Sequence, residues 1–102
     1  MTIRVLLCDD QPLVTDGIQL ILETDAMLKV VGVARDGIQA IEMVARVKPD
    51  MVLMDLKMPG MNGVHATQAI RRDYPNIPVL VLTGKSTYFV KAAAVGLGGR
   101  IS

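Results

Sequence analysis

Short apolar runs alternate along the chain with longer stretches in which apolar residues recur every three or four positions. The runs are rich in Val, Leu and Ile and are bounded by polar or turn-forming residues. Runs of this length and composition are typical of strands buried on both faces of a sheet. Four strands are predicted in this way, at residues 3–8, 30–34, 51–54 and 77–82.

The stretches between the runs have the spacing of amphipathic helices. Pro12 suits a first helical turn, and Asp36 and Asn62 are suitable N-caps. Helices are predicted over residues 11–24, from Asp36 to the stop at Pro49, over 63–73 and over 86–95. The tail that follows, GLGGRIS, is ambiguous.

This alternation of strands and helices predicts an α/β fold, a flavodoxin-like doubly wound parallel sheet with strand order 2-1-3-4-5. The 102 residues suffice for one domain, and a hydrophobic content of 51% argues against disorder. With 11 basic and 10 acidic residues scattered along the chain, no basic block suggests nucleic-acid binding by this segment alone. A lone cysteine, Cys8, and no signal-peptide or membrane-spanning pattern make a cytoplasmic location the default, with no membrane partner.

Acidic residues and a hydroxyl stand where the predicted strands end. Asp9 and Asp10 follow the first strand, Asp55 follows the third, and Thr83 follows the fourth. In this strand order the first and third strands are neighbours, so the three carboxylates are expected to converge. Clustered carboxylates favour a hard cation such as Mg²⁺, and the Lys57 carbonyl could complete its shell. The pattern reads as a metal-assisted phosphoryl site with one Asp as nucleophile; the alternative is that each is an ordinary strand-ending residue.

Three segments, VLLCDDQPLV, PDMVLMDLKMPGMNGVHATQAIR and IPVLVLTG, carry a resemblance to a known family. Over roughly residues 2–84 the chain resembles the receiver domain of two-component response regulators of the NarL/LuxR type. The resemblance implies a signalling domain rather than an enzyme, in which a histidine kinase phosphorylates Asp55. It further implies that Asp10 binds Mg²⁺ directly, that Asp9 assists through water, and that Thr83 reports phosphorylation. Pro59 and Gly63 match the residues that shape the loop after the phosphoacceptor.

The resemblance weakens after Gly84, where the expected loop is several residues shorter. Leu97 then stands at an aromatic switch position, and Arg100 at the position of a Lys that pairs with the phosphoryl group. Lys57 and Lys85 occupy positions that often tune the phosphoryl lifetime. We expect a receiver domain over residues 1–102 that is incomplete at its C-terminal end, with an atypical last strand and no final helix.

A DNA-binding domain is also expected to be absent, so DNA would be reached only through a domain missing from this chain. The shortened end is open to three interpretations: a truncated form, a frameshifted product or a divergent stand-alone receiver. Loss of the last helix would uncover apolar sheet surface, which predicts self-association as a dimer.

Three other functions compete with this prediction. The GKST segment ends like a nucleotide-binding P-loop, but such a loop needs a glycine where Val79 stands. A haloacid dehalogenase-type phosphatase needs a second Asp where Lys57 stands. The third alternative is a degenerate receiver that acts as a phosphorylation-independent protein-interaction module.

Overall fold

The computed structural model describes residues 2–56, 58 and 63–82, and within them seven elements alternate along the chain. The strands are β1 (Ile3–Cys8), β2 (Leu28–Ala34), β3 (Met51–Asp55) and β4 (Val79–Leu82). The helices are α1 (Pro12–Leu22), α2 (Gly37–Val47) and α3 (Gly63–Asp73). The helix predicted over 86–95 and a fifth strand lie outside the described residues.

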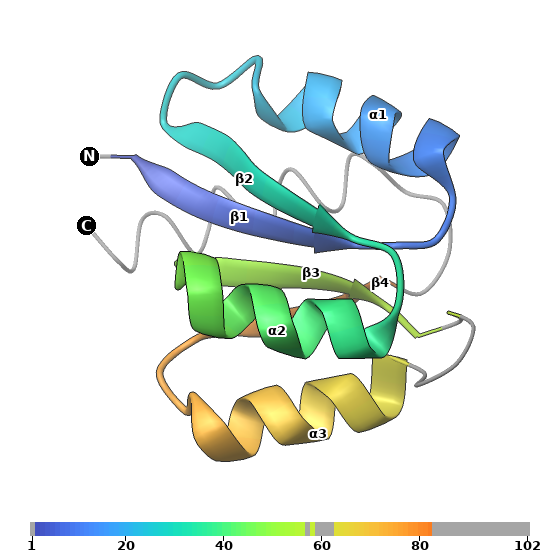
Figure 1. Ribbon diagram of the computed structural model, residues 1–102. Helices are drawn as coiled ribbons and strands as arrows, with labels where there is room; N and C mark the ends of the chain where they lie inside the picture. Colours follow the sequence, from blue (N-terminus) through green and yellow to red (C-terminus); the bar gives the residue numbers. More distant parts are fainter. Residues whose placement is uncertain (1, 57, 59–62, 83–102) are drawn as a thin grey trace.

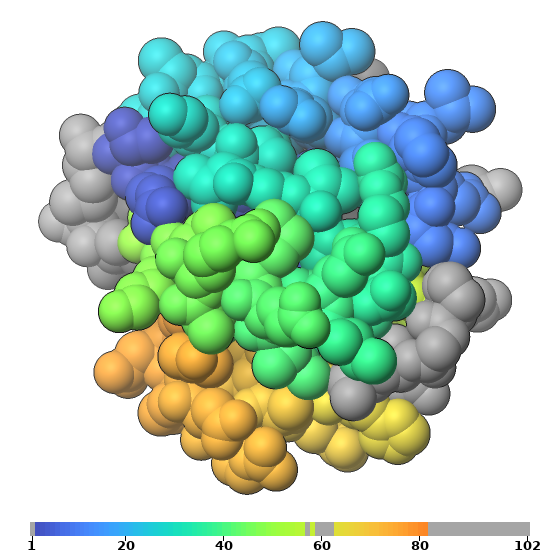
Figure 2. Space-filling model, viewed as in Figure 1, coloured from blue at the N-terminus to red at the C-terminus, as the bar shows by residue number. Residues whose placement is uncertain are grey.

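The four strands form one parallel sheet in the order β2-β1-β3-β4. The predicted flavodoxin-like order is therefore confirmed for these strands. Helix α1 covers one face of the sheet, and α2 and α3 lie side by side on the other (Figure 1). Figure 2 shows α2 and α3 forming a continuous surface over that second face.

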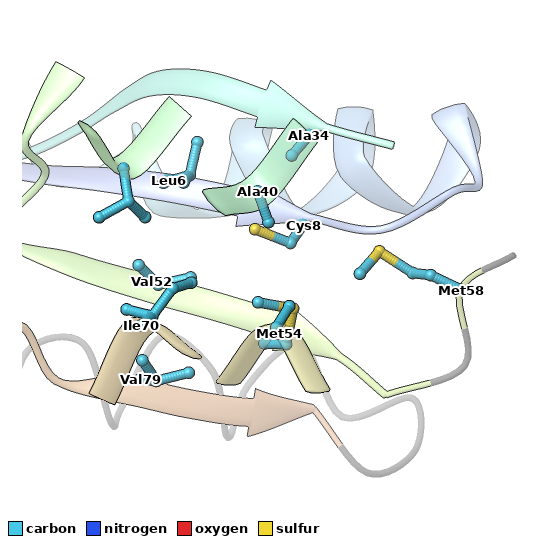
Figure 3. Close-up of a cluster of buried hydrophobic side chains, with 11 residues drawn as sticks. Leu6, Cys8, Ala34, Ala40, Val52, Met54, Met58, Ile70 and Val79 are labelled. Carbon is cyan, nitrogen blue, oxygen red and sulfur yellow. The ribbon is translucent and has the colours of Figure 1, made fainter. Parts of the chain in front are cut away.

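Alternating side chains of the central strands point to opposite faces and make two apolar cores. The core beneath α1 contains Val5, Leu7 and Leu53, together with Ile18 and Leu22 of the helix. The core beneath α2 and α3 is drawn in Figure 3 and consists of Leu6, Cys8, Ala34, Ala40, Val44, Val52, Met54, Met58, Ala66, Ile70 and Val79. Burial raises the pKa of Cys8 to about 12, so this thiol is a protonated core residue.

Two helix starts follow the predicted capping chemistry. Pro12 is in the first turn of α1, and the Asp36 carboxylate accepts a hydrogen bond of 2.8 Å from the Gln39 amide at the start of α2. The proposed cap of α3, Asn62, lies outside the described residues. None of the helices in the described ranges has the length and apolar content needed to cross a lipid bilayer.

Thr67 on α3 is buried, and its hydroxyl has no hydrogen-bond partner within the part of the chain that the structure describes. Thr67→Val replaces this hydroxyl with a methyl group of similar size, so we expect the free energy of unfolding to rise by about 1 kcal/mol. Urea unfolding measures the change.

The control for this prediction is Thr15→Val on α1. Thr15 is also buried, but its hydroxyl donates to the Pro12 carbonyl and accepts a hydrogen bond of 2.9 Å from Arg35. Thr15→Val should therefore lower the free energy of unfolding by about 1–2 kcal/mol. Equal losses in the two variants would contradict the prediction for Thr67.

Candidate functional site

The candidate site lies at the carboxyl edge of the sheet, where β1 and β3 end as neighbours. Cys8 pairs with Met54 in the parallel ladder, so the residues that follow them, Asp9 and Asp55, come to the same edge. The ligand atoms of Asp9, Asp10 and Asp55 all lie within 4.8 Å of one another. The predicted convergence of three carboxylates is present in the structure.

The three carboxylates differ in their exposure to solvent. Asp9 is buried, with 6% of its surface exposed, whereas Asp10 and Asp55 are half-buried. The Asp9 carboxylate accepts a hydrogen bond of 2.9 Å from the Gln11 amide, and its own amide donates to the Ala34 carbonyl over 3.0 Å. Asp9 is therefore held from both sides at the turn between β1 and α1.

The electrostatic environment disfavours the charged form of Asp9. Burial is the main cause of a raised pKa for this carboxyl, and the charges of Asp55 and Asp10 raise it further. The hydrogen bond from Gln11 and the positive charge of Arg35 act in the opposite direction. The cluster is thus under like-charge repulsion that a bound cation would relieve.

Gly63 supports the site from the start of α3. Its amide donates to the Leu56 carbonyl over 3.2 Å. A Cβ added to Gly63 would overlap the Asp55 carbonyl oxygen and lie 2.7 Å from the Leu56 Cα. The close approach of α3 to the end of β3 therefore requires a residue without a side chain at position 63.

Carboxylate oxygens at this spacing fit a hard divalent cation such as Mg²⁺. An octahedral magnesium shell needs oxygen ligands and usually retains several waters. A spread of up to 4.8 Å between the three groups suits a mixture of direct and water-mediated contacts. The other predicted site residues, Lys57, Thr83 and Arg100, lie outside the described residues.

Arg35 is a neighbour of the site that the sequence reasoning did not identify. Its guanidinium Nη1 donates to the Asp9 carbonyl over 3.2 Å and to the Thr15 hydroxyl over 2.9 Å. The available signal was its position directly after β2, whose carboxyl end shares an edge with that of β1. The positively charged guanidinium of Arg35 therefore lies next to Asp9 at this edge of the sheet.

Asp9→Asn should relieve part of the charge repulsion while keeping an oxygen that accepts from Gln11. In a chelator-containing buffer at pH 7 we expect the variant to gain about 1 kcal/mol in free energy of unfolding. A raised folded-state pKa means that the folded chain binds more protons, so the wild type gains stability as pH falls through that pKa. The advantage of the variant should therefore shrink on acidification.

Thermal unfolding of both chains between pH 7 and pH 4, without metal, measures this difference. With Mg²⁺ present the order should reverse, because the variant lacks one charged ligand. A constant difference between the two chains at every pH would contradict the prediction.

The chain matches a family described as response regulator receiver domain over residues 5–102. It is 46% identical over 83 residues to the response regulator protein VraR of Staphylococcus saprophyticus, which covers 81% of this chain and 40% of that protein. The VraR protein of Staphylococcus aureus is 47% identical over the same length. The chain thus spans about 40% of the length of these relatives.

Solved structures give the same fold. A LuxR-family two-component response regulator from Aurantimonas superposes with a TM-score of 0.76 and 33% identity, over 94% of this chain and 70% of that one. RcsB of Salmonella enterica, solved bound to a promoter in the presence of the phosphomimetic BeF₃⁻, superposes with a TM-score of 0.75 and 30% identity. That match covers 81% of this chain and 43% of RcsB.

Proposed function

Because this chain belongs to the response regulator receiver domain family of two-component systems, we propose that it accepts a phosphoryl group on Asp55 in a Mg²⁺-dependent reaction. The donor is a partner histidine kinase, which carries the group on a histidine side chain. The domain is a signalling domain and not a classical enzyme.

The observation that carries this proposal is the convergence of Asp9, Asp10 and Asp55 within 4.8 Å. Of these, Asp55 ends β3 and is more exposed than Asp9, so a partner protein can approach it. Asp9 is buried and already bonded to Gln11. This difference favours Asp55 over Asp9 as the acceptor. Asp10 is as half-buried as Asp55, so the choice between these two rests on the family to which the chain belongs, with Asp9 and Asp10 holding the cation.

In the proposed step, an oxygen of the Asp55 carboxylate forms a new bond to phosphorus. The bond from phosphorus to the donor histidine nitrogen breaks, and its electron pair stays on the imidazole. Asp9, Asp10, Asp55 and the Lys57 carbonyl would hold Mg²⁺, which supplies positive charge that neutralises the phosphoryl oxygens when it is bound. Gly63 keeps the Asp55 main chain in position throughout.

We propose that Thr83 and Arg100 act after the transfer, Thr83 by bonding a phosphoryl oxygen and Arg100 by pairing with the group. The whole of residues 1–102 would serve as the receiver unit. The output proposed for the complete regulator is transcriptional, since RcsB among the structural neighbours was solved on a promoter. A cytoplasmic location, self-association as a dimer and DNA contact through a further domain belong to the same proposal.

Incubation with acetyl phosphate and Mg²⁺, followed by intact mass measurement, tests the function. We expect a gain of one phosphoryl group per chain and no gain when a chelator replaces Mg²⁺. Borohydride trapping and peptide mapping should place the group on Asp55. No gain under any condition would contradict the proposal and favour a phosphorylation-independent interaction module.

A further inference from the structure

Arg35 connects three elements at the candidate site. It follows β2 directly, and its Nη1 reaches the Asp9 carbonyl at 3.2 Å and the Thr15 hydroxyl of α1 at 2.9 Å. The last main-chain bond between β1 and β2 runs from the Asp9 amide to the Ala34 carbonyl. The Arg35 side chain therefore continues the β1–β2 ladder one step beyond its last main-chain bond.

The main chain of Arg35 is itself held in place by the first turn of α2. Its amide donates to the Gln39 side-chain oxygen over 2.8 Å, and the Gln39 amide donates to the Asp36 carboxylate over 2.8 Å. The guanidinium thus extends from a fixed loop, and less conformational entropy is lost in placing it.

The positive charge of Arg35 lies next to Asp9, the buried member of the acidic cluster. Unlike Arg72, which pairs with Asp73 on the exposed end of α3, Arg35 donates its described hydrogen bonds to neutral oxygens. The guanidinium is half-buried, where charges are screened less than on an open surface. Its positive charge acts to lower the pKa of Asp9, although burial and the neighbouring carboxylates keep that pKa raised overall.

We propose that Arg35 is a positioning residue that also supplies a resident positive charge beside the acidic site. In the metal-free chain it holds Asp9 and the start of α1 in place and offsets the repulsion among the carboxylates. When a divalent cation binds, the two positive charges compete. Only the part of this inference that concerns Mg²⁺ binding rests on the proposed function.

The first test is the Mg²⁺ affinity of Arg35→Gln, measured by isothermal titration calorimetry with Mg²⁺ alone. Glutamine removes the charge but keeps an amide donor near the Asp9 carbonyl. We expect the dissociation constant to fall by about three- to tenfold, because a nearby like charge has been removed. Arg35→Lys keeps the charge and should stay within about twofold of the wild type.

The matched control is Arg4→Gln. Arg4 also donates from Nη1 to a main-chain carbonyl, that of Lys48 at 2.9 Å, but it lies near the start of β1 and not at its carboxyl end. Its replacement should leave the Mg²⁺ dissociation constant unchanged. A purely structural role for Arg35 would weaken Mg²⁺ binding or leave it unchanged, and could not tighten it.

The second test needs no metal. In chelator, Arg35→Gln should lower the melting temperature by about 4–8 °C, and in an Asp10→Asn background by at most about half as much. If Arg35→Gln alone unfolded in chelator while the double variant with Asp10→Asn stayed folded, the result would support the inference more strongly. Asp10 makes no described hydrogen bond to Arg35, so this cycle isolates the effect of charge.

Two results would each overturn the inference: an unchanged or weaker Mg²⁺ affinity of Arg35→Gln beside a wild type that binds, or equal melting losses in the two backgrounds. A wild type that binds no Mg²⁺ would instead contradict the proposed function. The metal-free cycle then still decides the role of Arg35.

Discussion

Asp55→Asn is expected to abolish phosphorylation of the chain by acetyl phosphate, with no phosphoryl gain detectable by intact mass. The amide lacks the negatively charged oxygen that attacks phosphorus, whereas Asp9 and Asp10 would remain as ligands. The fold should survive, because Asp55 joins the sheet through its main chain, paired with Leu82 of β4. The Mg²⁺ dissociation constant should rise by about tenfold, since one of three carboxylates has lost its charge.

Asp50→Asn is the matched control for this change. Asp50 directly precedes β3, at the opposite end of the strand from Asp55. Its carboxylate accepts a hydrogen bond of 2.8 Å from the Arg4 amide. Asparagine can accept the same bond, so phosphorylation should remain at the wild-type level. Transfer to Asp55→Asn at the wild-type rate would show that another residue is the acceptor.

How well the sequence predicted each strand depends on how the strand is buried. Strands β1 and β3 lie in the middle of the sheet with both faces covered, and their apolar runs were placed to within one residue, although Arg4 interrupts the run of β1. At the edge, β2 begins at Leu28, two residues before its predicted start, and the exposed Lys29 disguises this beginning. An edge strand has a neighbouring strand on one side only, so polar residues are tolerated in it and its apolar pattern is weaker.

The start of β4 was predicted two residues too early for a different reason. Residues 77–82 form a continuous apolar run, but the strand begins at Val79. The Ile77 amide donates to the Tyr74 carbonyl in a turn that follows α3, and Pro78 has no amide to donate. Hydrophobicity alone does not record which main-chain groups are already used in a turn.

The carboxylate cluster could be predicted because it depends on topology alone. Parallel strands end at a common edge, so Asp9 and Asp55 meet once β1 and β3 are neighbours. The role of Arg35 could not be predicted in this way, since it depends on a long side chain crossing from β2 toward α1. The positions of Thr83, Lys57 and Arg100 stay predictions, because they lie outside the described residues.

Gly63→Ala is expected to lower the free energy of unfolding by about 2–4 kcal/mol and to reduce phosphorylation of Asp55. The new Cβ would overlap the Asp55 carbonyl oxygen and lie 2.7 Å from the Leu56 Cα and 2.9 Å from the Asp55 carbonyl carbon. These atoms belong to the main chain at the end of β3, so no side-chain rotation can relieve the overlap. Either α3 moves away from the sheet or the Asp55 main chain shifts out of the site.

Gly17→Ala separates this steric effect from the general effect of adding a methyl group to a helical glycine. Gly17 lies within α1, and a Cβ added there meets no atom within 4 Å. Alanine is favoured over glycine in a helix, so this variant should gain about 0.5–1 kcal/mol. Urea unfolding and acetyl phosphate labelling of both variants make the comparison. If Gly63→Ala were as stable and as readily phosphorylated as Gly17→Ala, the close approach of α3 to Asp55 would not be what fixes the acceptor in place.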